Sequence, residues 1–298
     1  MAITYVAWPT TTTVVTADTS NEFGENLSGL FYQTAAAPQS AILWAVQNSP
    51  SKMYNLVWNG STYAKNTTNS WSAGKTFRYP NGTGAPDAEG VTMAELNSPA
   101  IYVSTERDGS GSNRFSVLRY DTSASGTTLN ATNEWNLTSD LPVVGSTNLG
   151  SEGIAWVPDS YLQANQFLDK NTGLSYDPAN YPSHDRPVFL LSSKPMGRFM
   201  STRLTRPGST YVRIATFASD HASVIDLSFD RDVGILWAYC DNNCSNRSHL
   251  FAIDTVVGSP TKGKFILRKL DVQHQQRRHC NRAGIGMHQQ SEDFLVVR

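Results

Sequence analysis

A set of four short strand-like segments recurs four times along the chain. The first segments of the four sets begin at residues 27, 89, 152 and 224, so successive repeats lie about 60 to 70 residues apart. Second segments of the sets include Gly234–Tyr239, which is almost wholly apolar, whereas outer segments such as Met53–Trp58 alternate apolar and polar residues. No stretch of helix length shows a period of 3.6 residues, so the sequence indicates an all-β protein.

The character of these segments predicts a β-propeller. A four-stranded sheet with two apolar faces cannot bury both of them alone, but sheets stacked around an axis bury all of these faces and leave only short edges. We therefore expect a propeller of four-stranded blades within residues 1–270, with four recognisable blades and the C-terminal end as the place where a further blade is missing. A β-sandwich of many short strands is the alternative, and the regular repeat favours the propeller.

Acidic residues stand where the first strands of the blades begin. In a propeller these strands line the central channel, so their first residues face one another. Glu89 and Glu152 occupy this position, and each is followed by a glycine. Carboxylates gathered in a channel repel one another unless a cation neutralises them, and oxygen ligands suit Ca²⁺. The predicted ligands are Glu89, Glu152, Asp87, Glu25 and Asp226. Alternatively, these acids accept hydrogen bonds from strand-edge N–H groups and bind no metal.

Further polar residues follow the second strands of two blades. Glu106, Arg107, Asp108 and Asp241 are predicted to border the mouth of the channel, where a substrate would enter. The alternative is ordinary turn chemistry, with Glu106 and Arg107 paired. The sequence contains no Gly-x-Ser-x-Gly elbow and no His-Glu-x-x-His motif, so no catalytic residue is assigned. His184 and His221 are isolated and are interpreted as loop residues.

Composition and sequons indicate an extracellular protein. Only 16% of the residues are charged, and Cys240 and Cys244 flank a short Asp-Asn-Asn turn that a disulfide could close, although a pair of reduced thiols is the alternative. For a secreted protein, we expect that a signal peptide has been removed from this sequence or replaced by the start codon. Eight Asn-x-Ser/Thr sequons are candidate glycosylation sites: Asn26, Asn59, Asn66, Asn81, Asn130, Asn136, Asn243 and Asn246.

Charge and hydropathy exclude two classes of partner. The net charge is −1, which gives no attraction to nucleic acid, and the apolar runs are far shorter than the roughly 20 residues of a membrane helix. A small molecule or a glycan is the expected ligand.

Six segments resemble secreted proteins of the "esterase-like activity of phytase" family, within the phytase-like and SMP30-like propellers. They are residues 24–30 (GENLSGL), 86–91 (PDAEGV), 102–108 (YVSTERD), 134–138 (EWNLT), 153–159 (GIAWVPD) and 236–244 (LWAYCDNNC). The resemblance implies a propeller with acidic residues and Ca²⁺ at its axis, and hydrolysis of phosphoesters or carboxyl esters. One departure is Lys194, which stands where relatives carry an acidic residue.

Two functions follow from these observations. The first is a Ca²⁺-dependent extracellular hydrolase, in which Glu89 and Glu152 are metal ligands and the metal activates a water. The second is a non-catalytic extracellular glycoprotein scaffold, a propeller that binds carbohydrate or another protein. Axial carboxylates favour the first, and the lack of an obvious base or nucleophile favours the second.

The last 28 residues depart from the strand pattern. Residues 271–298 begin where a fifth blade would start, and the codons for residues 273–288, read one base later, permit an Asn-Asn-Glu-Gly segment of the kind expected there. We interpret this tail as frameshifted and poorly ordered, the alternative being a genuine divergent tail. The cluster of His274, His279, Cys280 and His288 is accordingly given no function.

Overall fold

In the computed structural model, β-strand is the main regular structure of the chain. The structure describes residues 4–8, 26–34, 40–141, 150–182, 184–194, 197–219, 221, 223–245, 247–274, 285–287 and 294–296. The chain divides into two compact units, the first made of residues 1–13 and 154–277 and the second of residues 14–153 and 278–298. Helices in the described part are short, and none is long and apolar enough to cross a bilayer.

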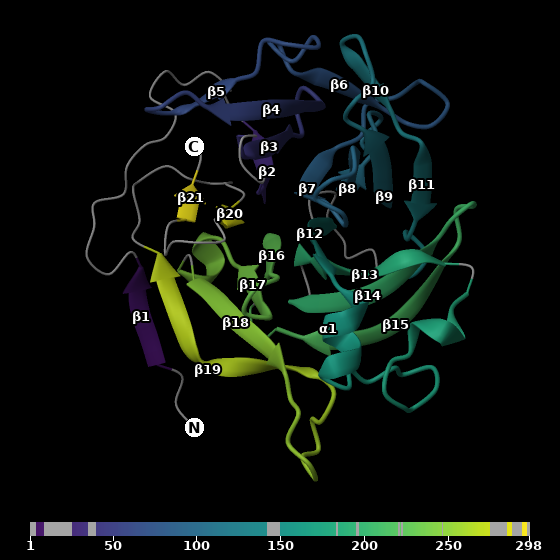
Figure 1. The fold of residues 1–298 in the computed structure, drawn as a ribbon, viewed down its shortest axis with the longest axis vertical. Coiled ribbons are helices and arrows are strands. Elements are labelled where there is room, and N and C mark those ends of the chain that lie inside the picture. Colours follow the sequence, from purple (N-terminus) through teal and green to yellow (C-terminus); the bar gives the residue numbers. More distant parts are fainter. Residues whose placement is uncertain are drawn as a thin grey trace. The chain divides into compact units, whose positions relative to one another are not determined.

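Two sheets belong to the second unit, and in each the strands run as an antiparallel meander (Figure 1). The first contains β2 (Leu27–Gln33), β3 (Ile42–Gln47), β4 (Lys52–Trp58), β5 (Tyr63–Lys65) and β6 (Lys75–Arg78), with β10 (Thr128–Asn130) added in parallel to β6. The second contains β7 (Ala88–Thr92), β8 (Ala100–Arg107), β9 (Asn113–Asp121) and β11 (Asn133–Asn136).

Apolar side chains fill the space between these two sheets. Val46 and Met53 of the first sheet pack in one cluster with Val91, Ile101 and Leu118 of the second, and all five are buried. A separate buried cluster covers the opposite face of the first sheet. Burial on both faces explains why the inner segments read as continuous apolar runs.

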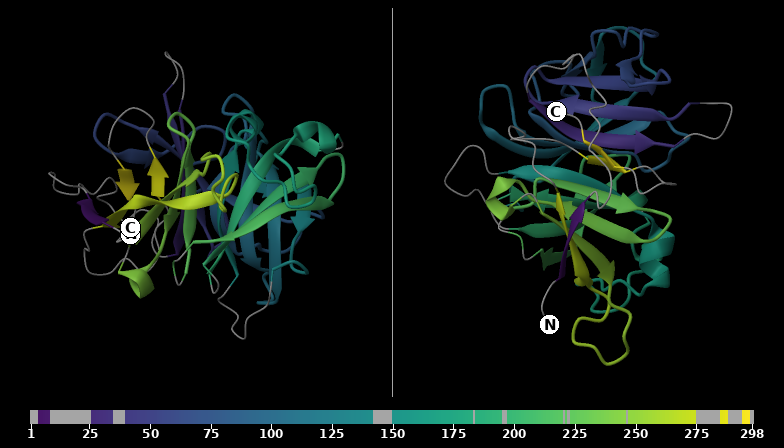
Figure 2. Two further views of the ribbon diagram at one scale, coloured as in Figure 1. Left: turned by 90° about the horizontal axis from the view of Figure 1, so that it is seen from below. Right: turned by 90° about the vertical axis from the view of Figure 1, so that its left-hand side faces the viewer.

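The sheets of the first unit follow the same plan. One contains β12 (Ser151–Val157), β13 (His184–Ser193), β14 (Arg198–Thr205) and β15 (Tyr211–Ala218). The other contains β16 (Asp226–Asp230), β17 (Ile235–Tyr239), β18 (Arg247–Ile253) and β19 (Phe265–His274), and β1 (Thr4–Trp8) pairs in parallel with β19 (Figures 1 and 2). A short 3-10 turn, η3 (Asn242–Cys244), joins β17 to β18.

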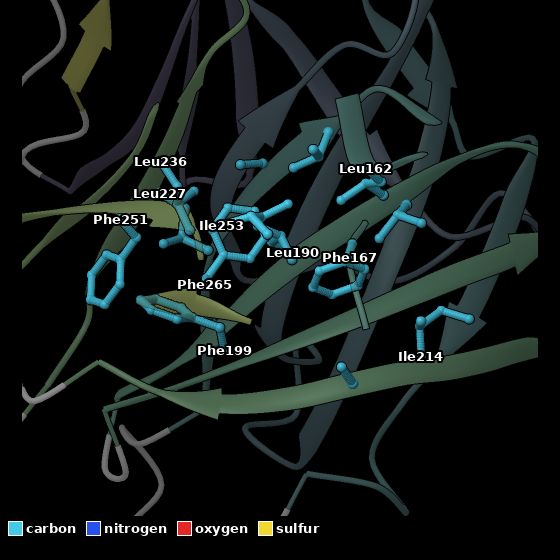
Figure 3. Close-up of a cluster of buried hydrophobic side chains, with 14 of the residues drawn as sticks. Leu162, Phe167, Leu190, Phe199, Ile214, Leu227, Leu236, Phe251, Ile253 and Phe265 are labelled. Atoms are coloured by element: carbon cyan, nitrogen blue, oxygen red, sulfur yellow. The ribbon is translucent and has the colours of Figure 1, made fainter. Parts of the chain in front are cut away.

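An insert between β12 and β13 completes the core of this unit. It contains α1 (Asp159–Ala164) and the 3-10 turn η1 (Pro178–Asn180), and its Leu162 and Phe167 join a buried cluster with Leu190, Phe199 and Phe251 of the two sheets (Figure 3). Through these side chains the insert is part of the core of the unit and not a surface loop.

The predicted fold class is confirmed. The chain is a β-propeller of four blades with very little helix, and the sixteen predicted blade strands occur within a few residues of their expected bounds. The pattern did not reveal α1, β5 or β10. In the tail, β19 continues to His274, and β20 (Ile285–Met287) pairs with β21 (Phe294–Val296). The frameshift stays a prediction, and His279, Cys280 and His288 lie outside the described residues.

Candidate functional site

A β-bulge sets the position of Glu89. In the ladder between β7 and β8, Ala88 is opposite Thr105 and Gly90 is opposite Ser104, so Glu89 is an extra residue with no partner of its own in the register. The hydroxyl of Ser104 accepts a hydrogen bond from the N–H of Gly90 at 2.9 Å. Bulges redirect a side chain out of the regular alternation of a strand, and Glu89 is consequently a buried carboxylate at the start of an inner strand.

Three carboxylates meet at this bulge. Asp87, Glu89 and Glu106 each offer one oxygen, and these oxygens lie within 4.8 Å of one another. Backbone hydrogen bonds hold the two strands together here, because Asp87 N–H donates to the carbonyl of Arg107 and Glu106 N–H donates to the carbonyl of Asp87, both at 3.0 Å. Glu106 is 1% exposed, so its carboxylate belongs to the interior.

Arg107 is the cation that the chain places in this cluster. Its Nε lies 2.7 Å from Oδ2 of Asp87, and its Nη2 lies 3.3 Å from Oε2 of Glu106. Burial alone would lower the pKa of Arg107, but the hydrogen bond with Asp87 and the charges of Asp87, Glu106 and Glu89 outweigh burial and raise it. By formal charge, three carboxylates and one guanidinium give the cluster an excess of negative charge.

The donor set fits a hard cation such as Ca²⁺. Two oxygens bound to one Ca²⁺ at about 2.3–2.6 Å can be at most about 5 Å apart, and the three carboxylate oxygens satisfy this limit. The side chain of Asn48 lies beside them, with its Nδ2 donating to Oε1 of Glu89 at 3.3 Å. Excess negative charge away from water favours binding of a cation.

Only part of the predicted ligand set comes together. Asp87 and Glu89 share the cluster, but the group of three carboxylates does not include Glu152, whose carbonyl accepts a hydrogen bond from the Ser104 hydroxyl. Asp226 belongs to the other unit, where its Oδ1 accepts the N–H of Leu227 at 2.8 Å. Glu25 lies outside the described residues.

The predicted mouth residues have different roles. Glu106 and Arg107 are parts of the acidic cluster, whereas Asp108 organises a turn. Its Oδ1 accepts hydrogen bonds from the hydroxyl and N–H of Ser110, and the hydroxyl bond, as the largest influence, lowers the pKa of Asp108. Asp241, in the other unit, accepts the N–H of Asn243. Sequence reasoning did not place Glu106 or Asn48 beside Glu89, because the first contact depends on the register of β7 with β8 and the second on how the sheet that contains β3 packs against β7.

The structure also shows how the predicted cysteine pair and the sequon asparagines are arranged. Cys240 and Cys244 are joined by a disulfide with their Cα atoms 5.7 Å apart. The amide of Asn66 is engaged, because its Nδ2 donates to Oδ1 of Asn55 and its Oδ1 accepts the N–H of Thr68. Asn66 is half-buried and Asn246 lies outside the described residues. The other six sequon asparagines are exposed: Asn26, Asn59, Asn81, Asn130, Asn136 and Asn243.

Fold and site together define a β-propeller that carries a buried acidic cluster. No protein-family model matches the sequence, and no curated protein is recognisably similar to it. Among solved structures, a Bacteroides uniformis protein named as a 6-phosphogluconolactonase is similar at 11% identity with a TM-score of 0.44. The match covers 83% of this chain but only 55% of that protein. A chain of a mitotic checkpoint complex is similar at 10% identity and a TM-score of 0.34, covering 91% and 83% of the two chains.

Proposed function

We propose that the protein is an extracellular propeller that binds Ca²⁺ at Asp87, Glu89 and Glu106 and hydrolyses esters of a small molecule. The observation that supports this proposal is the meeting of three carboxylate oxygens within 4.8 Å, with Arg107 as a counter-charge that contacts two of the three side chains. The motif resemblance to phytase-like esterases supports the reaction class. Bound Ca²⁺ would polarise the carbonyl or phosphoryl oxygen of an ester.

The side chains of the site have separate tasks in this proposal. The three carboxylates hold the cation. Arg107 fixes Asp87 and Glu106 through its two contacts, so these two carboxylates are oriented before a metal arrives. Asn48 restrains Glu89 in the same way. Restraint of the ligands lowers the entropic cost of assembling the site.

A non-catalytic scaffold is the second candidate, and the position of Arg107 favours it. An arginine that already bridges Asp87 and Glu106 could make the cluster a purely structural ion network. In that case the exposed sequon asparagines and a bound partner would define the function.

Calcium titration tests the metal site on which the first proposal depends. We expect one Ca²⁺ site by calorimetry and at least about tenfold weaker binding in Glu89→Gln, because that change removes one anionic ligand. Glu95→Gln, an exposed glutamate in the same unit, is the charge-matched control and should bind as the unaltered protein does. Arg107→Gln removes a positive charge that competes with the metal and also a restraint on Asp87 and Glu106. We expect the loss of the competing charge to be the larger effect, so this variant should bind Ca²⁺ more tightly. Equal binding by Glu89→Gln and Glu95→Gln, or no heat at all, would exclude the metal site.

Activity is tested with p-nitrophenyl acetate and p-nitrophenyl phosphate. The proposed hydrolase should lose turnover when a chelator removes Ca²⁺ and should recover it when Ca²⁺ is returned. Calcium binding without turnover of either ester class would favour the scaffold.

Glycosylation gives a separate test of the extracellular assignment. After expression through a glycosylating secretory pathway, we expect glycans on exposed sequon asparagines such as Asn59 and Asn81, and none on Asn66. A glycan on Nδ2 of Asn66 would displace the hydrogen bond to Asn55. Peptide mass spectrometry before and after glycosidase treatment measures the occupancy. Unmodified peptides throughout, from protein that is secreted, would contradict the assignment.

A further inference from the structure

A histidine stands beside the disulfide of the first unit. Cys240 follows β17, and Cys244 ends the short turn that leads toward β18. The two sulfur atoms and a ring nitrogen of His221 lie within 4.8 Å of one another. Cys240 and His221 are buried and Cys244 is half-buried, so most of this compact ligand set is shielded from water.

The ring of His221 is held in place by its surroundings. It stacks on the ring of His249, with the ring centroids 3.5 Å apart and the planes 9° from parallel. Nδ1 of His249 lies 2.9 Å from the carbonyl oxygen of Ser219, and the N–H of His221 donates to the hydroxyl of the same serine at 3.1 Å. A histidine positioned by stacking and backbone contacts loses little freedom when it binds a metal.

Backbone contacts with Gly197 also hold the segment that carries Ser219 and His221. The N–H of Ser219 donates to the carbonyl of Gly197 at 2.7 Å, and a side chain at Gly197 would collide with the carbonyl of His221. The backbone carbonyl oxygen of Ser223 lies 4.0 Å from Sγ of Cys244, so the segment that follows His221 also contacts the second cysteine.

The spacing of the ligands suits zinc. Two cysteines separated by three residues fall within the range of thiolate pairs in zinc sites, and thiolate with imidazole is a ligand combination that Zn²⁺ prefers over Ca²⁺. We propose that reduction of the Cys240–Cys244 disulfide converts this group into a Zn²⁺ site formed by Cys240, Cys244 and His221. This inference is independent of the acidic cluster and of the proposed hydrolase activity.

The chemistry of the conversion balances. A dithiol transfers two electrons and two protons to the disulfide, the S–S bond breaks, and the dithiol becomes a disulfide. Zn²⁺ then replaces the two thiol protons, which pass to solvent, and accepts a lone pair from the imidazole. The oxidised protein has neither thiolate, so the disulfide closes the site.

Cobalt titration tests the proposal. The experiment uses the full chain with Cys280→Ser, which leaves Cys240 and Cys244 as its only cysteines, reduced with a dithiol that is then removed under argon. We expect one equivalent of Co²⁺ to produce a thiolate-to-cobalt charge-transfer band that Zn²⁺ abolishes. The oxidised protein should show no such band, and His221→Ala should weaken binding by at least about tenfold.

His184→Ala is the matched histidine control and should bind as the parent does. Circular dichroism of the reduced protein checks that it remains folded. Binding that is equal in the oxidised and reduced forms, or unchanged in His221→Ala, would overturn the proposal. A reduced protein that unfolds and is not refolded by Zn²⁺ would overturn it as well.

Discussion

Asp159→Asn is expected to lower the free energy of unfolding by about 3 kcal/mol, because it leaves the charge of Arg203 buried without its counter-ion. Arg203 lies in β14 and is 2% exposed. Its Nη1 contacts Oδ1 and Oδ2 of Asp159 at 3.1 and 3.3 Å, and Asp159 begins α1 of the insert. The ion pair therefore ties the insert to the blade.

Two tyrosines of the insert complete the surroundings of this arginine. The guanidinium lies 5.5 Å from the ring centre of Tyr176 and 5.7 Å from that of Tyr181, and the Tyr176 hydroxyl donates to Oδ1 of Asp159 at 2.8 Å. Burial lowers the pKa of Arg203, which is the sign of a cation whose desolvation is costly. The aromatic rings offset part of that cost, but among the residues that the structure describes Asp159 is the carboxylate that forms an ion pair with Arg203.

Urea unfolding measures the effect. Asp232→Asn, an exposed aspartate of the same unit, is the matched control and should change stability by less than about 0.5 kcal/mol. Combining Asp159→Asn with Arg203→Met should recover much of the loss, because the buried charge is then gone. A single variant as stable as its control would show that the ion pair does not hold the insert.

The sequence was sufficient to predict the blades but not this insert. Strand patterns such as that of Val188–Ser193 follow from burial on both faces and can be recognised residue by residue. The α1 helix has six residues, which is too short to show a helical period. Arg203 occurs in a strand whose sequence mixes polar and apolar residues, so no local pattern indicates that Arg203 is buried beside Asp159.

The acidic cluster likewise contains residues that a local sequence pattern predicts and one that depends on contacts between strands. Glu89 can be selected because an acidic residue before a glycine recurs at the start of an inner strand, and Asp87 lies two residues before Glu89 in the same segment. The contribution of Glu106 depends on the register of β7 with β8, where one extra residue changes which side chains meet. Local patterns do not encode that register, so the sequence alone predicts Glu106 only as a residue of the channel mouth.

The close approach of two inner strands explains why a glycine is needed at residue 29. In the ladder of β2 and β3, Leu27 is opposite Gln47 and Gly29 is opposite Val46, which leaves Ser28 as the extra residue. This bulge matches the one at Glu89. A Cβ on Gly29 would lie 2.5 Å from the carbonyl oxygen of Glu89 and 2.9 Å from Cα of Gly90. Both are backbone atoms, so no rotamer change can relieve the overlap.

Gly29→Ala is therefore expected to destabilise the protein by about 2–3 kcal/mol and to displace the strand segment that carries Glu89. Gly109→Ala is the matched control, because a Cβ there would meet Ala85 at 3.4 Å, an ordinary contact, and should cost well under 1 kcal/mol. Urea unfolding gives the stability of both variants, and calcium titration tests whether displacement of Glu89 also weakens any metal binding. Equal stability of the two variants would mean that the strands separate without cost, and that Gly29 does not determine the position of Glu89.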